Sequence, residues 1–507
     1  MCPNSARGGI LDNEGSCKNP MTHFVSTRGG VAPVDFETAV LQGFAADGGL
    51  FVPETIPQIS EEQLREWSGL SYIDLAFEIL SLFIERTIIS EDELRELLRD
   101  SFSTFEHPDV VPVIGLETKP NTYIMELFNG PTLSFKDVAM GFLVNTVDFF
   151  LKRKNDWVSL LVATTGDTGP AAAHASADKK SIECWVLYPA GMVSEEQERQ
   201  MTTLEAPNVH AVGVNGCPDG GDDLDLVLAR MFADDNLKQD LKLSSVNSIN
   251  WCRVMAQAVH YFYGYFRVVD RVGEKIVFSV PSGAFGNLFA GYLARTMGLP
   301  VKAYICANNQ NATLHRVLST GHLTKEDLKP TVSSAIDIVV PYNFWRYLYF
   351  TSGRDHGKIR QWMDEFHCQG SVRLDSQTAN EIQQGFISAS ITDEQTLSTI
   401  ADVYRSRDGY LLDPHAAVAV AAADTLSNTF APDTKVVCLA TAHAAKFPNV
   451  IRKALSLDGK LPEQAVHKSI EAVKDLCQHV RLCDCTKLAP ALTRAMQSVT
   501  KYRKGSS

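Results

Sequence analysis

The segment EKIVFSVPSGAFGNLFAGYLARTMGLPVKAYICAN, residues 274–308, contains the pattern that decides the fold. An apolar run ends at a glycine-bearing loop, a helical pattern follows the loop, and a second apolar run comes after it. Two parallel strands need a crossover connection of this length, which is usually a helix. The segment therefore predicts a β-strand, an α-helix and a second strand parallel to the first.

The same alternation continues along most of the chain from about residue 120. The other apolar runs are TYIMELF (122–128), WVSLLVA (157–163), SIECWVLYPA (181–190), NVHAVGVNG (208–216) and DTKVVCLAT (433–441). This rhythm is typical of α/β proteins, in which helices cover both faces of parallel sheets. A chain of 507 residues exceeds one compact core, so we expect two such lobes.

The two ends of the chain have different patterns. Residues 61–105 have helical periodicity, and Ser90 is the predicted N-cap of the helix SEDELRELL. We predict a loose extension, a mostly helical N-terminal domain, a two-lobed catalytic region and a C-terminal helical appendage. Their predicted bounds are residues 1–25, 26–105, 106–455 and 456–507.

Composition excludes several classes of protein. The net charge of −13 argues against a surface for nucleic acid or an anionic membrane. No apolar run reaches the roughly 18 residues of a membrane span, and the first 25 residues lack the patterns of signal and transit peptides. The 11 cysteines lack zinc-ligand spacing. We expect a cytoplasmic protein without a metal site whose partners are small molecules, and the oligomeric state stays open.

Three loops at predicted strand ends contain residues suited to chemistry. In SGAFGN, Gly283 and Gly286 allow close backbone approach where a helix begins near Asn287, an arrangement that suits a phosphate. Taken alone, the loop could be a plain tight turn into a helix, and the other motifs are needed to favour phosphate binding. In ATTGDTG, hydroxyl and backbone donors suit a carboxylate, although a capped helix start explains the loop equally well. Thr441 directly follows the last apolar strand.

Lys136, in LFNGPTLSFKDVAMGFL (127–143), occupies an unusual position. If its helix begins near Leu133, Lys136 shares the apolar face with Met140 and Leu143, while Asp137 falls on a more polar side. Burying an ammonium group is costly. The side chain therefore either extends to water or has a lowered pKa and is reactive.

Together these features match the requirements of pyridoxal 5'-phosphate, which needs an attachment lysine, a phosphate site, a substrate carboxylate site and a partner for its ring nitrogen. The sequence also resembles the threonine synthase family of fold-type II pyridoxal-phosphate enzymes over about residues 26–460. The motifs that carry the resemblance are FNGPTLSFKD, ATTGDTG, VPSGAFGN and TAHAAKF, supported in order by STRGG, DGGLFVP, RQMTT, NSINW and PYNFWRYL.

The resemblance implies a two-lobed fold of parallel sheets flanked by helices, and it implies roles for particular residues. Lys136 is the implied catalytic residue, to which the cofactor attaches. The implied cofactor-binding residues are Lys136, Gly283, Ala284, Phe285, Gly286, Asn287 and Thr441. The expected substrate-binding residues are Thr165, Gly166, Asp167, Thr168, Ser248, Asn250, Arg253 and Lys446. For the substrate phosphate, Arg253 is favoured over Lys446, although it could instead be a surface arginine.

The resemblance also implies an activity, that of a carbon–oxygen lyase acting on phosphates. The expected reaction converts O-phospho-L-homoserine and water to L-threonine and phosphate, with the amine of Lys136 removing the α-proton. The alternative is a threonine synthase-like phospho-lyase, which degrades O-phosphohomoserine or O-phosphothreonine to a 2-oxo acid. A non-catalytic binding protein is disfavoured, because Lys136 and both glycine-bearing loops are intact.

Overall fold

The computed structural model describes residues 22–505, so residues 1–21 of the predicted extension lie outside the described part. One lobe is built on a six-stranded sheet in the order β13-β10-β9-β14-β4-β3. All neighbouring strands are parallel except β3, which is antiparallel to β4. The strands are β13 (Ile387–Ser390), β10 (Val301–Asn308), β9 (Ile276–Pro281), β14 (Val436–Ala440), β4 (Thr122–Glu126) and β3 (Val113–Gly115).

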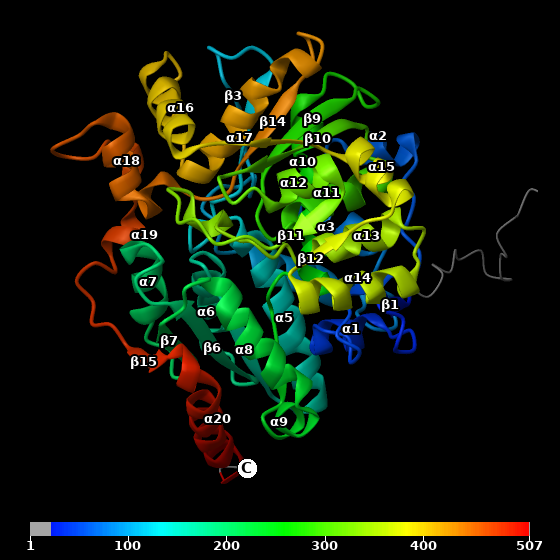
Figure 1. The fold of residues 1–507 in the computed structure, drawn as a ribbon, viewed down its shortest axis with the longest axis vertical. Helices are drawn as coiled ribbons and strands as arrows, with labels where there is room; N and C mark the ends of the chain where they lie inside the picture. Colours follow the sequence, from blue (N-terminus) through cyan, green and yellow to red (C-terminus); the bar gives the residue numbers. More distant parts are fainter. Residues whose placement is uncertain (1–21, 506–507) are drawn as a thin grey trace, which may run out of the picture.

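The second lobe is built on a fully parallel five-stranded sheet in the order β15-β7-β6-β5-β8, which lies below the first sheet in Figure 1. Its strands are β15 (Val480–Asp484), β7 (Val209–Asn215), β6 (Ile182–Pro189), β5 (Val158–Ala163) and β8 (Leu243–Ser244). Strands β5 and β6 are buried at every position, as expected when both faces of a parallel sheet are covered. The predicted α/β fold class of two lobes is confirmed.

Helices cover the sheets of both lobes. Around the five-stranded sheet are α6 (Thr168–Ser176), α7 (Glu195–Thr202), α8 (Gly221–Ala233), α9 (Asp235–Asp240) and α20 (Leu488–Gly505). Around the six-stranded sheet are α10 (Trp251–Val268), α11 (Gly286–Thr296), α16 (Asp393–Arg405), α17 (Pro414–Thr425) and α18 (Pro448–Leu455). The outer elements are α12 (Thr313–Thr320), α13 (Phe344–Thr351), α14 (His356–Gln369) and α15 (Ser376–Gly385), with the antiparallel pair β11 (His322–Thr324) and β12 (Ser371–Arg373). Helix α5 (Lys136–Lys154) packs against both α6 and α10.

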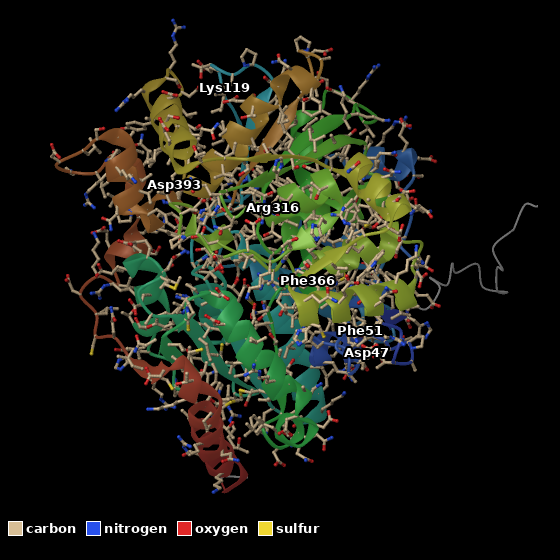
Figure 2. The ribbon with its side chains drawn as sticks, viewed as in Figure 1. Asp47, Phe51, Lys119, Arg316, Phe366 and Asp393 are labelled. Carbon is tan, nitrogen blue, oxygen red and sulfur yellow. The ribbon has the colours of Figure 1, made fainter. Side chains whose placement is uncertain are left out.

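The N-terminal segment packs into the larger core. It contains β1 (Phe24–Ser26), α1 (Phe36–Gln42), β2 (Phe51–Pro53), α2 (Glu61–Trp67), α3 (Tyr72–Leu80) and α4 (Glu91–Phe102). Helix α4 begins after Ser90, whose side chain accepts from the amide of Glu93, as the sequence predicts. Asp47 accepts hydrogen bonds from the hydroxyl of Ser26 (2.7 Å) and the amide of Gly30 (2.6 Å), closing the turn before β2. Figure 2 labels Asp47 next to Phe51, the first residue of β2.

The C-terminal segment differs from the predicted helical appendage. It contains the helices α19 (Lys468–Glu471) and α20, but it also supplies β15, which extends the five-stranded sheet beside β7. Helical periodicity could not reveal this strand, because its burial pattern depends on pairing with a strand far earlier in the chain.

The remaining features concern membrane-spanning helices, metal-ligating groups and the cysteines. Within residues 22–505, no helix has the length and apolarity needed to cross a membrane. The same residues contain no group of three or more metal-ligating side chains. Cys184, Cys306 and Cys438 lie in apolar strands and are fully buried.

Candidate active site

Two loops that follow neighbouring strands pair with each other at the carboxyl edge of the six-stranded sheet. The lysine loop, residues 127–135, follows β4, and residues 441–447 follow β14. The amide of Phe135 donates to the carbonyl of Thr441 (2.8 Å), and the amide of His443 donates to the carbonyl of Leu133 (3.1 Å). This pairing places Thr441 beside the residue that precedes Lys136.

Helix α5 begins at Lys136, three residues after the expected start near Leu133. Leu133 has φ of +60°, a left-handed conformation that a helix cannot contain. The carboxylate of Asp137 accepts from the amide (2.9 Å) and hydroxyl (2.6 Å) of Thr132, which closes the turn before the helix. The expectation that Asp137 lies on a polar face is wrong, because it is buried at 4% exposure. Burial raises the pKa of Asp137 to about 6, against the effect of these hydrogen bonds.

The ammonium group of Lys136 has no hydrogen bond or ion pair with any described residue. It lies over the ring of Phe135, whose centroid is 4.2 Å from Nζ. Burial lowers the pKa of Lys136 to about 7, the charge of Arg253 lowers it further, and the charge of Asp167 opposes both effects. A substantial fraction of Lys136 is therefore a neutral, nucleophilic amine at neutral pH.

The phosphate loop, residues 282–287, lies between β9 and α11 and is closely packed. A Cβ atom added at Gly283 would lie 3.1 Å from the Cα atom of Ile336, and one added at Gly286 would lie 3.2 Å from Cβ of Ser248. Helix α11 starts at Gly286, so the amides of its first turn have no acceptor within the helix. No other described group accepts from the amides of residues 286–288. These free donors suit a phosphate.

The side chain of Asn287 points back into the core. Its Oδ1 atom accepts from the hydroxyl of Tyr261 (2.9 Å) and lies 3.0 Å from Nε2 of His260. Its Nδ2 atom is buried and has no partner among the described groups. Asn287 therefore has its backbone amide, rather than the oxygen of its side chain, available to a phosphate.

The carboxylate loop, residues 164–168, lies between β5 and α6. The hydroxyl of Thr164 accepts from the amides of Gly166 and Gly169, both at 3.0 Å, which fixes the turn. Gly166 has φ of +144°, and an added Cβ atom there would lie 2.5 Å from Nε2 of Gln197. Thr165 and Thr168 are partly buried, without a recorded hydrogen bond from their hydroxyls to any described residue. These two hydroxyls remain available for a carboxylate.

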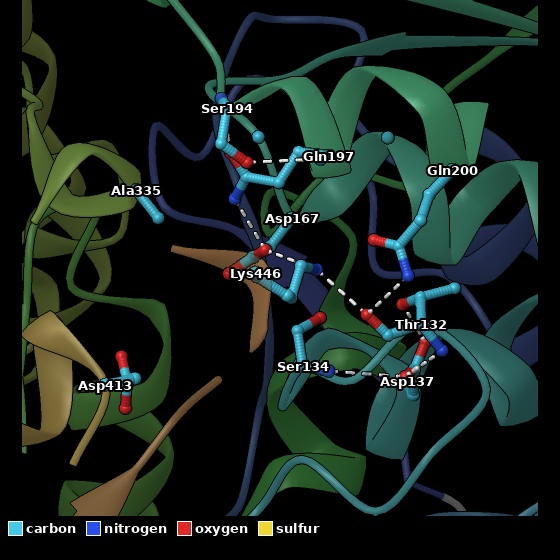
Figure 3. Close-up of polar contacts among 12 residues, drawn as sticks. Thr132, Ser134, Asp137, Asp167, Ser194, Gln197, Gln200, Ala335, Asp413 and Lys446 are labelled. Carbon is cyan, nitrogen blue, oxygen red and sulfur yellow. Dashed lines mark hydrogen bonds and ion pairs between the residues drawn. The ribbon is translucent and has the colours of Figure 1, made fainter. Parts of the chain in front are cut away.

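Asp167 and Lys446, both predicted to contact substrate, form an ion pair with each other. Oδ1 of Asp167 lies 2.7 Å from Nζ of Lys446 and accepts from Nε2 of Gln197 at 2.8 Å. Nζ of Lys446 also donates to the carbonyl of Thr132 (2.8 Å), as Figure 3 shows. Burial opposes ionisation of Asp167, but the charge of Lys446 and these hydrogen bonds hold its pKa below the usual value.

The predicted residues near the start of α10 divide into two groups. Asn250 caps α10 by accepting from the amide of Cys252 (3.1 Å), and it donates to the carbonyl of Val40 (2.8 Å). The hydroxyl of Ser248 accepts from Nδ2 of Asn343 (2.9 Å). Asn250 is thus engaged in the fold, whereas Ser248 borders the phosphate loop through Gly286.

Arg253 is a buried cation without a carboxylate partner among the described residues. It is 1% exposed, which excludes the alternative of a surface arginine. One guanidinium nitrogen donates to the carbonyl of Val246 (3.0 Å), while Nε has no partner. Burial lowers the pKa of Arg253 to about 10, so it stays charged at neutral pH. A buried guanidinium with free donors suits an anion.

A cavity of about 440 Å³ lies between the two lobes beside the carboxylate loop. Its lining includes Thr165, Ser194 and Gly221 from one lobe and Thr331, Asp337 and Phe447 from the other. Burial raises the pKa of Asp337 to about 6, against hydrogen bonds from Thr331 and Asn309. Of the predicted site residues, Thr165 is the one that lines this cavity.

Two glutamines of α7 belong to the site, although the sequence reasoning assigned them no role. Gln197 contacts Asp167, and Nε2 of Gln200 donates to the carbonyl of Thr132 (3.2 Å). They are three residues apart and share one face of the helix. The available signal was their position, because Gln200 lies within the quoted segment RQMTT (199–203) and Gln197 lies two residues before it. Polar residues on an exposed-looking helix gave no reason to expect burial, yet Gln197 is 0% exposed.

The residues present fit pyridoxal phosphate. Lys136 offers an unpaired amine, the first turn of α11 offers free amides, and the hydroxyl of Thr441 has no recorded partner in the described structure. Arg253 adds a buried guanidinium with an unpaired donor. These groups match attachment, phosphate and ring-nitrogen functions.

Comparisons with known protein families give three matches along the chain. The model described as "Threonine synthase N terminus" matches residues 23–102. The model described as "Pyridoxal-phosphate dependent enzyme" matches residues 110–442. The model described as "Threonine synthase, C-terminal" matches residues 416–489.

Individual proteins are similar over most of the chain. A threonine synthase of Schizosaccharomyces pombe is 39% identical over 464 residues, covering 85% of this chain and 89% of the relative. A threonine synthase-like 2 protein of Xenopus laevis is 39% identical over 462 residues, covering 90% of this chain and 95% of the relative. The crystal structure of a pyridoxal-phosphate-bound threonine synthase from Brucella melitensis matches with a TM-score of 0.84 at 34% identity. The match covers 94% of this chain and 99% of that structure's chain.

Proposed function

Because the chain belongs to the threonine synthase family of pyridoxal-phosphate-dependent enzymes, we propose that it converts O-phospho-L-homoserine and water to L-threonine and phosphate. In this reaction phosphate leaves Cγ of the substrate and the oxygen of water bonds to Cβ. Such a carbon–oxygen lyase needs a mobile proton, a site for a phosphorylated side chain and a site for an α-carboxylate.

The observation that carries the proposal is that the amine of Lys136 lies within the electrostatic influence of Arg253, and that neither side chain has a carboxylate partner among the described residues. Lys136 has a pKa lowered to about 7, partly by the charge of Arg253, so the two side chains act on each other. Arg253 is buried without a carboxylate partner among the described residues. A neutral amine beside a permanent cation suits a substrate that combines an acidic α-proton with a phosphate.

Most of the predicted residues are assigned a role in the proposed reaction. Bound pyridoxal phosphate acts as an electron sink that makes the α-proton acidic. Lys136, with its lowered pKa, takes that proton and returns one at neutral pH. Amides at residues 283–287 hold the phosphate of the cofactor, and the hydroxyl of Thr441 contacts its ring nitrogen. Arg253 binds the substrate phosphate, while Thr165, Gly166 and Thr168 bind the substrate carboxylate.

The second candidate is a phospho-lyase that releases a 2-oxo acid from O-phosphohomoserine or O-phosphothreonine. It is supported by the relative named threonine synthase-like 2, which is as similar as the threonine synthase of S. pombe. Both activities use the same proton and phosphate sites. They differ in whether water adds at Cβ before the product leaves.

A product assay separates these activities. The purified holoenzyme is incubated with O-phospho-L-homoserine, and threonine, 2-oxobutanoate and phosphate are quantified together. Threonine equal to the phosphate released supports the synthase, and 2-oxobutanoate equal to phosphate supports the lyase. Phosphate release without either product, or no reaction, contradicts both. O-Phospho-L-threonine in a parallel assay tests the second lyase substrate.

We also propose that the enzyme acts in the cytoplasm on small molecules, with Lys136 as the Schiff-base lysine. The support for a reducing compartment is that all nine cysteines within residues 22–505 are free. The net charge of −13 supports the absence of a nucleic-acid or membrane partner.

A further inference from the structure

A buried ion pair between Lys446 and Asp167 connects the two lobes at the candidate site. Asp167 precedes α6 beside the five-stranded sheet, whereas Lys446 follows β14 of the six-stranded sheet. Their side chains are 0% and 3% exposed and 2.7 Å apart. Desolvating two charges offsets much of their attraction, so a buried pair is weak evidence for a stabilising role. Its position therefore matters more than its strength.

The pair also holds the lysine loop. Nζ of Lys446 donates a second hydrogen bond, 2.8 Å long, to the carbonyl of Thr132. Gln200 donates to the same carbonyl, and Gln197 donates to Asp167. One face of α7 thus contacts both ends of the connection, as the dashed lines of Figure 3 show.

The connection continues from Thr132 to the start of α5. The amide and hydroxyl of Thr132 donate to the carboxylate of Asp137, the residue after Lys136. Asp167 in turn belongs to the carboxylate loop, where Thr165 and Thr168 face the proposed substrate carboxylate. These contacts form a continuous path from the carboxylate loop through Asp167, Lys446 and Thr132 to Asp137, the residue after Lys136.

We propose that Lys446 and Asp167 are positioning residues that couple occupancy of the carboxylate loop to the placement of Lys136. The proposal rests on the proposed function, because it needs a ligand with an α-carboxylate. In it Lys446 is not a ligand of the substrate phosphate, the role that the sequence reasoning considered for it. Two of the three donors of its ammonium group are already engaged by Asp167 and Thr132.

The test uses a double variant and a matched control. Lys446→Met with Asp167→Asn removes both charges together, and the asparagine can still accept from Gln197. The control is Lys435→Met, because Lys435 is also buried and pairs with Asp270 (2.8 Å) and the carbonyl of Val268 (3.0 Å). Lys435 precedes β14, at the end of that strand opposite the site. The control thus loses the same kinds of bond away from the proposed coupling.

Hydrogen–deuterium exchange of the holoenzymes is measured with and without 2-amino-5-phosphonopentanoate, which cannot lose phosphate because carbon replaces the bridging oxygen. In the wild type and in Lys435→Met, the ligand should slow exchange in residues 164–169 and also in residues 127–135. In the double variant, it should slow exchange in residues 164–169 alone. Retained slowing at 127–135 in the double variant, or its loss in Lys435→Met, would overturn the proposal, as would no slowing in the wild type.

Kinetics give an independent readout. Misplacing a reacting group by about 1 Å can cost on the order of 100-fold, so kcat of the double variant should fall by about 10- to 100-fold while KM changes by less than about threefold. A rise in KM alone would instead make Lys446 a substrate ligand and overturn the proposal. If the double variant does not fold, Gln200→Leu, which removes a neutral bond to Thr132, should show part of the same loss of coupling. A wild type that makes threonine without coupled exchange refutes the coupling alone, whereas an inactive wild type refutes the proposed function.

Discussion

Lys136 and Lys446 lie in the same site but in opposite electrostatic situations. Lys446 is fully buried, and its ammonium is balanced by the carboxylate of Asp167 and the carbonyl of Thr132. Lys136 is only partly buried, yet its ammonium has no partner among the described residues, and Arg253 adds a repelling charge. The two lysines therefore differ in their counterions: a carboxylate balances the charge of Lys446, whereas Lys136 has none among the described residues and its pKa is lowered.

The contrast between paired and unpaired cations extends to Arg253, the proposed ligand of the substrate phosphate. Arg253 keeps its charge with donors to spare, which suits a ligand that brings negative charge. The site as a whole thus separates three tasks. In the proposed function, Lys446 holds the two loops together, Arg253 binds the substrate phosphate, and Lys136 exchanges protons.

The largest effect is expected from Lys136→Ala. Loss of the amine removes both cofactor attachment and the proton transfers, so turnover should fall by about 10³-fold or more. Mass spectrometry after borohydride reduction should find the cofactor bound to the wild type at Lys136 and absent from the variant. Cofactor attached at Lys446 in the wild type would reverse the comparison.

The next effect is expected from Arg253→Ala. Leaving one partner of a desolvated charge pair alone costs about 2–5 kcal/mol, so kcat/KM for O-phosphohomoserine should fall by a few powers of ten. Arg253→Lys should restore activity only in part, because an ammonium group lacks the paired donors of a guanidinium. Binding of homoserine, which lacks the phosphate, should change little. If Arg253→Ala weakened the binding of both ligands equally, Arg253 would not be the ligand of the substrate phosphate.

A smaller effect concerns the pH dependence of Lys136. In the cofactor-free protein, trapping of pyridoxal phosphate at Lys136 should rise about tenfold between pH 6 and pH 8, because the pKa is about 7. Arg253→Ala should move this rise to higher pH, since the charge of Arg253 lowers the pKa. Borohydride trapping at fixed times, followed by peptide mapping, measures both shifts.

The same lowered pKa predicts a trend in stability. Between pH 7 and about pH 10 the unfolded chain binds a proton at this lysine that the folded protein does not, so the free energy of unfolding should rise with pH through that window. In Lys136→Met the free energy of unfolding should rise less steeply with pH. Urea unfolding midpoints of both proteins at pH 7 and pH 9 measure this difference. Parallel trends in the two proteins would contradict an unpaired Lys136.

The smallest effect is expected at Thr441, beside Lys136. Its hydroxyl is proposed to contact the ring nitrogen of the cofactor without acting as a nucleophile. Thr441→Ser keeps the hydroxyl and should retain most activity, whereas Thr441→Val should bind the cofactor more weakly by about 0.5–1.5 kcal/mol. Cofactor titration of both variants measures this difference, and equal affinities would argue against the contact.

The local features of the site could be predicted from the sequence, because they depend on residues close together in the chain. Apolar runs separated by helical patterns indicated parallel sheets, and β5, β6, β9, β10 and β14 form where those runs occur. Glycines at 283 and 286 marked the tight loop before α11. An isolated lysine on an apolar helix face singled out Lys136.

The partners of these residues were decided by the tertiary structure. Lys446 and Thr132 are 314 positions apart, and no local pattern indicates that they share a hydrogen bond. The burial of Arg253, the pairing of β15 with β7 and the start of α5 at Lys136 likewise depend on distant segments. By itself the sequence determined the fold class and predicted Lys136 as the reactive lysine, because periodicity and loop chemistry are local. Only the tertiary structure decided which charges are paired and which are free, because pairing depends on how the two lobes meet.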